Sequence, residues 1–85
     1  MITTGQLTVG TTRVAVDSSS VGVFTLIVHN ASNTNNIFLG SETVTASTGL
    51  ELHSHEYVTI QMLPGDTLYA VCSSGTHDIS WMKVS

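Results

Sequence analysis

The residues with the clearest potential for chemistry are two histidines in the run His53-Ser54-His55-Glu56. On a β-strand, side chains two positions apart point to the same face, so both imidazoles could reach one metal ion. Glu56 would then point to the opposite face. A polar turn between two strands is the alternative and the favoured interpretation. The spacing therefore makes His53 and His55 weak candidate metal ligands, and no cofactor is expected.

Nucleophilic catalysis requires a serine or cysteine beside a histidine and an orienting acid. These residue types are present, but the chain has no Gly-x-Ser-x-Gly elbow. Cys72, the only cysteine, alternates with Leu68 and Ala70 in an apolar run, which is typical of a buried structural thiol. His77 and Asp78 are adjacent, and adjacent strand residues face opposite ways. We therefore expect no catalytic residue and predict that the protein is not an enzyme.

The elements that must position these residues are short runs rich in β-branched side chains, with no helical periodicity. Turn residues separate them at intervals of roughly 8–12 residues, as in sandwiches and small barrels. The loop 30–36 and the turn Pro64-Gly65-Asp66 are the strongest breaks. The pattern predicts an all-β fold, either a small antiparallel β-sandwich or a jelly-roll-like barrel of seven to nine short strands. Residues 1–85 form a single domain, with 1–5 as a flexible or strand-adding N-terminal arm.

Alternation also predicts which side chains face the core. In the run 21–29, one face carries Phe24, Leu26 and Val28, and the other carries Val23 and Ile27. The runs 56–62 and 67–72 alternate in the same way, and 43–45 is a further short candidate strand. The run 77–84 is apolar on both faces. It turns inward either Ile79 with Trp81 or Met82 with Val84, and the pattern leaves both open.

Charge is scarce in this chain. Of its 85 residues, two are Lys or Arg and six are Asp or Glu, which gives a net charge of −4 and a charged fraction of 9%. An average soluble protein has roughly 25%. Two cations cannot form the basic patch that nucleic-acid binding needs, and no apolar stretch approaches the ~18 residues of a membrane helix. We therefore expect neither nucleic acid nor membrane as a partner.

Four runs follow one another in an order that resembles a known group. They are Val9-Gly10-Thr11-Thr12, Asn33-Thr34-Asn35-Asn36-Ile37-Phe38-Leu39-Gly40-Ser41, Val44-Thr45-Ala46-Ser47-Thr48-Gly49-Leu50 and Leu63-Pro64-Gly65-Asp66-Thr67-Leu68-Tyr69-Ala70-Val71. Together they are similar to small all-β virion structural proteins of tailed bacteriophages, of the capsid decoration or head-associated type. The resemblance extends from Val9 to Val84. It departs from the group at His53-Ser54-His55-Glu56, where a small glycine-containing turn is usual.

The resemblance implies a non-enzymatic minor capsid protein that decorates and cements the shell. Its partner would be the major capsid protein, its location the capsid surface of the virion, and its place of assembly the bacterial host cytoplasm. It would form a homo-oligomer, for which a trimer is one assembly that the resemblance suggests; the sequence does not fix the number of subunits. The alternative is a tail- or baseplate-associated or host-glycan-binding module, which predicts an exposed aromatic near the loop 30–36.

A remote alternative is a cupin-like metal-binding protein, since cupins are small β-barrels with a His-x-His pair. The chain lacks the Glu that follows this pair in cupins, and Pro64-Gly65 is followed by Asp66 rather than His. For a docking surface, the best candidates are outward apolar residues and the two cations. The interface candidates are Val23, Ile27, Trp81, Met82, Arg13 and Lys83.

Overall fold

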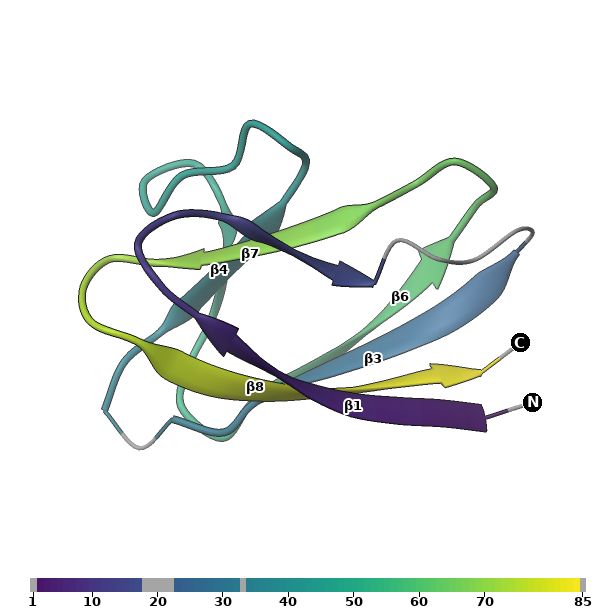
Figure 1. Cartoon of the computed structure of the whole chain (residues 1–85), viewed down its shortest axis with the longest axis horizontal. Coiled ribbons are helices and arrows are strands. Elements are labelled where there is room, and N and C mark those ends of the chain that lie inside the picture. Colours follow the sequence, from purple (N-terminus) through teal and green to yellow (C-terminus); the bar gives the residue numbers. More distant parts are fainter. Residues whose placement is uncertain (1, 18–22, 33, 85) are drawn as a thin grey trace.

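The protein is described here from a computed structural model covering residues 2–17, 23–32 and 34–84 (Figure 1). Its strands are β1 (Ile2–Val9), β2 (Val14–Asp17), β3 (Phe24–Asn30), β4 (Ile37–Gly40), β5 (Leu50–Leu52), β6 (Tyr57–Met62), β7 (Leu68–Cys72) and β8 (His77–Val84). Among these residues there is no helix long and apolar enough to cross a membrane.

The eight strands form two four-stranded antiparallel sheets. The first sheet has the order β1-β8-β3-β6 and the second the order β2-β7-β4-β5. Four of the pairs are nested around the middle of the chain: β4 pairs with β5, β3 with β6, β2 with β7 and β1 with β8. The chain is therefore one long hairpin, rolled so that β8 also pairs with β3 and β7 with β4. This is a jelly roll, so the predicted β-sandwich is confirmed.

Strict alternation places the core between the two sheets. Along β3, every second residue from Phe24 to Asn30 is buried, and the residues between them are half-buried. The inner faces contribute the buried cluster of Val9, Val16, Phe24, Leu26, Val28, Ile37, Leu39, Leu52, Met62, Leu68, Ala70, Cys72 and Ile79. Trp81 packs against this cluster, while Met82 and Val84 are exposed. The open choice in β8 is thus settled: Ile79 and Trp81 face inward.

Three expectations about individual segments need correction. Residues 2–5, expected to be a flexible or strand-adding arm, are not flexible: they are the first half of β1 and pair with the end of β8, with Ile2 opposite Val84. Met1 lies outside the described residues. Asn30, expected to begin a loop, ends β3 and is fully buried. Residues 43–45 lie in turns rather than in a strand, because the backbone N–H of Val44 bonds back to the carbonyl of Ser41.

The central glycine of β1 is explained by Trp81. Gly5 pairs with Trp81 across the β1–β8 ladder. A Cβ atom on Gly5 would lie 2.5 Å from Cζ2 and 2.7 Å from Cε2 of the indole. The ring therefore occupies the space above the glycine, and the strand keeps Gly at this position for packing rather than for an unusual backbone angle.

Candidate interaction surface

The first sheet turns one face to the core and the other outward, and this second face is the strongest candidate site. The strand registers align its outward residues in three rows that run across β1, β8, β3 and β6. We call these twelve residues the outer face. They are Ile2, Val84, Thr25 and Gln61; Thr4, Met82, Ile27 and Thr59; and Gln6, Ser80, His29 and Tyr57.

Exposed apolar side chains gather on this face. Ile2 is 64% exposed, Tyr57 70%, Val84 38% and Met82 36%. Val23 and Leu63, just outside the ends of β3 and β6, are also exposed. Among the described residues, only Leu50 of the second sheet is an exposed large hydrophobic elsewhere. A one-sided concentration of this kind is typical of a surface that contacts another protein.

The centre of the outer face is hollowed. A shallow depression of about 340 Å³ lies over its second and third rows. Ile27 and Met82, which are paired across the β3–β8 ladder, contribute apolar walls. Polar groups of Thr4, Gln6, His29 and Ser80 surround them. This arrangement of apolar walls and a polar rim can accept an apolar side chain from a partner.

Formal charge is excluded from the outer face. None of its twelve residues is Asp, Glu, Lys or Arg. The closest carboxylate along β8 is that of Asp78, beyond the third row, where it accepts a hydrogen bond of 3.0 Å from the Thr8 hydroxyl. A partner that covers these twelve residues therefore does not have to desolvate the side chain of an Asp, Glu, Lys or Arg. Desolvation of a charged group is the most costly part of burying polar surface.

The interface candidates from the sequence divide into two groups. Ile27 and Met82 lie side by side in the depression. Val23 is 54% exposed and lies just before β3, beyond the first row of the outer face. Trp81 packs its side chain against the core, since its register partner Val28 is an inner residue, although Trp81 is also among the residues that line the depression. Lys83 also points inward, with its Nζ 5.6 Å from the centre of the Phe24 ring. Arg13 lies away from this face, beside Glu42 and Tyr69.

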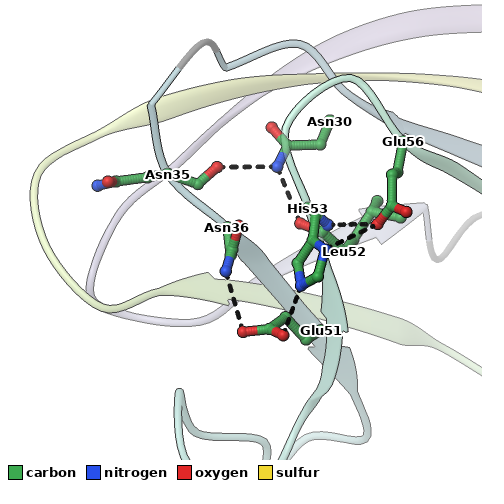
Figure 2. Close-up of polar contacts among 7 residues, drawn as sticks. All are labelled: Asn30, Asn35, Asn36, Glu51, Leu52, His53 and Glu56. Atoms are coloured by element: carbon green, nitrogen blue, oxygen red, sulfur yellow. Dashed lines mark hydrogen bonds and ion pairs between the residues drawn. The ribbon is translucent and has the colours of Figure 1, made fainter.

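The histidine pair lies in the segment between β5 and β6, and Figure 2 shows His53 with its neighbours. The two rings have different neighbours. Nε2 of His53 is 2.6 Å from Oε1 of Glu51, whereas the ring centre of His55 is 6.3 Å from that of His29, with the two planes tilted by 39°. His55 has a φ of 63°, in the left-handed region that the turn requires. The same-face geometry of a strand is therefore lost, and no three metal-ligating side chains converge among the described residues.

Hydrogen bonding gives the Glu51–His53 pair its electrostatic character. The bond to Glu51 raises the pKa of His53, and the same bond, with one from Asn36, lowers the pKa of Glu51. The carboxylate of Glu56 accepts the backbone N–H of His53 at 2.9 Å and lies 3.6 Å from its ring (Figure 2). These groups are largely exposed, so the cluster orders the turn and contributes little to stability.

Serine and histidine do meet elsewhere, in a pair that the sequence did not indicate. The hydroxyl of Ser32 is 3.1 Å from Nδ1 of His77, and Nε2 of His77 is 2.9 Å from the carbonyl of Ser74. Nε2 of His77 also lies 2.7 Å from Nδ2 of the Asn35 side chain. The Ser32 oxygen also accepts the backbone N–H groups of Thr34 and Asn35, each at 3.2 Å. The pair ties the loop after β3 to the turn before β8.

The alternative of a host-glycan-binding module predicts an exposed aromatic near the loop 30–36. The amides there are engaged within the fold, since Asn30 and Asn35 bond to backbone carbonyls and Asn36 bonds to Glu51. The exposed aromatic is Tyr57, which belongs to the outer face rather than to that loop. Comparison of the chain with family models, curated proteins and solved structures finds no match to any of them.

Proposed function

We propose that this chain is a non-enzymatic structural protein of a tailed-phage virion, a decoration protein that binds the major capsid protein through its outer face. The observation that carries the proposal is the apolar, charge-free depression formed by Ile27 and Met82 at the centre of that face. The resemblance of the ordered motifs to small phage virion proteins supplies the biological setting.

The outer face has the composition expected of an interface centre. Interface centres are depleted in charged residues, and a few anchored side chains supply most of the binding energy. A stable interface covers about 800 Å² on each partner. That is about one sixth of this protein's 4812 Å² of accessible surface, an area that one face of a four-stranded sheet can provide.

A shell partner suits this surface for a second reason. A capsid repeats each binding site by symmetry, so a modest interface is multiplied over many copies of the decorating chain. Each copy stabilises the shell by covering apolar surface on both sides of the contact. Since the outer face carries no charge, its binding to the shell should depend weakly on salt.

The test begins with particles purified from the phage that encodes the chain. Mass spectrometry should find the chain in intact particles, and electron microscopy should locate it on the head. Location on the tail would replace the decoration role with the tail-associated alternative. Absence of the chain from intact particles would refute a virion role altogether.

A variant pair then tests the surface. Met82→Glu places a carboxylate in the depression, and Leu50→Glu makes the same change at an exposed apolar residue of the second sheet. An unpaired charge in an interface centre costs about 2 kcal/mol or more, so Met82→Glu should weaken binding to undecorated shells at least about 30-fold. Leu50→Glu should bind like the wild type. Equal binding by both variants would contradict the assignment of this face.

A further inference from the structure

The strand β1 lies at the edge of the first sheet, and one of its sides pairs with β8. No described strand pairs with the other side. At its end, the carbonyl of Val9 meets the thiol of Cys72 at 3.5 Å and the adjacent Gly10 carbonyl accepts the Cys72 N–H. The free edge is therefore the segment 2–8, seven residues of extended backbone.

This edge lacks the features by which proteins usually block edge strands. Short length, charged side chains, proline and bulges are the common protections. The other sheet has both of its edges protected: β5 has three residues, and β2 has four with a register shift between Ala15 and Asp17. β1 has eight residues in unbroken register and contains no charge and no proline.

We propose that the free edge of β1 pairs in antiparallel fashion with β1 of a second copy of this chain. Residues 2–8 of one copy would run antiparallel to residues 2–8 of the other. This register is symmetric about Gly5, so Gly5 faces Gly5 and Thr4 faces Gln6 of the other copy. Residues that face each other in such a ladder lie on the same side of the sheet. The two copies are related by a twofold axis perpendicular to the sheet, and the interface is isologous.

Charge makes a second copy a suitable occupant. The chain carries a net charge of −4, yet the seven residues that would face their copies are all uncharged. Self-pairing therefore brings no like charges into opposition, which would destabilise a cross-strand pair. The result is an eight-stranded sheet in which both outer faces lie on the same side. The two depressions then lie on the same side of one continuous sheet, and one Asp78 from each copy lies on that side as well.

Sedimentation velocity of the isolated protein over a range of concentrations tests the pairing. The wild type should form a dimer at concentrations of tens of micromolar, since a single strand pair buries less than a standard interface. In the double variant Thr4→Lys and Gln6→Lys, each introduced ammonium faces one from the other copy. We expect the dissociation constant of the dimer to rise at least about ten-fold.

A matched variant makes the result specific to β1. Thr59→Lys and Gln61→Lys add the same two charges to the same sheet face, on the opposite edge strand β6. All four positions are exposed, so both variants should unfold thermally like the wild type. A dimer weakened only by the β1 variant supports the pairing. A wild type that stays monomeric at several hundred micromolar, or that forms a trimer, overturns it. Weakening only by the β6 variant, or equally by both, also overturns it.

This outcome is separable from the proposed function. Met82→Glu tests the depression in the middle of the sheet and leaves the free edge unchanged. A chain that binds shells but stays monomeric would retain the proposed function and lose the β1 pairing. A chain that dimerises through β1 but binds no capsid shell would retain the β1 pairing and lose the proposed function.

Discussion

Asn30 is the buried polar residue whose removal should damage this fold most. Its Nδ2 donates to the carbonyl of Asn35 at 3.0 Å and to the carbonyl of Leu52 at 2.9 Å (Figure 2). Its Oδ1 accepts the backbone N–H of Ser32 at 2.9 Å. One fully buried side chain thus joins the end of β3, the following loop and the end of β5.

Substitution of Asn30 by Ala leaves three backbone groups without these partners. A buried group that loses its hydrogen bond costs about 1–3 kcal/mol. Some relaxation is expected, so we predict a loss of about 3–5 kcal/mol in the free energy of unfolding. Urea denaturation followed by Trp81 fluorescence measures it. With a slope near 1 kcal/mol/M, the midpoint should fall by about 3–5 M, or the variant should be unfolded in water.

Two further variants keep the Asn30 argument testable. Asn30→Asp retains the acceptor for Ser32 but turns an oxygen toward two carbonyls. Burial raises the pKa of such a carboxyl above its unfolded value, so the variant should be least stable at neutral pH and recover as the pH falls. Asn36→Ala removes only a bond to exposed Glu51 and should cost less than about 0.5 kcal/mol. A loss below 1 kcal/mol for Asn30→Ala would refute the reasoning.

Three other predictions follow from the site and the packing. Gly5→Ala should shift Trp81 fluorescence and cost about 1–3 kcal/mol, whereas Gly10→Ala, whose Cβ would lie 3.8 Å from Thr76, should be nearly neutral in the same denaturation assay. Glu51 and His53 stabilise the turn only while both are charged. That contribution fades as the pH falls through the lowered pKa of Glu51 and as it rises through the raised pKa of His53; an NMR titration should show the His53 pKa dropping toward 6.5 in Glu51→Gln. Zinc at tenfold excess should leave the melting temperature within about one degree, because His53 and His55 face different partners; a shift lost on His53→Ala would contradict this.

Local alternation predicted most of the fold. The inner faces of β3, β6 and β7 follow directly from period-two patterns, and the Pro64-Gly65 turn follows from residue chemistry, with Gly65 at a φ of 89°. The loop after β3 also behaves as its composition indicates, since Asn30 and Ser32 bond nearby backbone N–H groups. These features depend only on neighbours in the sequence.

The remaining features depend on partners far along the chain. Asn30 resembles a loop residue because its burial depends on Leu52, 22 positions away. The first half of β1 was not predicted as a strand. It contains Gly5, a residue uncommon inside strands, and the close approach of the Trp81 indole explains this glycine. The outer face is an alignment of four strands, so only part of it is visible in any one run. Ile27 and Val23 were identified from the single run 21–29. Placing Ile2, Tyr57 and Val84 on the same face requires the pairing register of the strands.

The central position of β8 has a consequence for how the chain folds. β8 is the last strand in sequence, yet it lies between β1 and β3 in the first sheet. Until β8 has been synthesised, β1 has no partner in its own sheet and β3 has only β6. Pairings this distant in sequence make folding slow, in the range of milliseconds to seconds. We therefore expect folding to be completed only after β8 leaves the ribosome. Newly made chains then pass through an interval in which β1 is unpaired and one edge of β3 is free, and a chaperone can bind both.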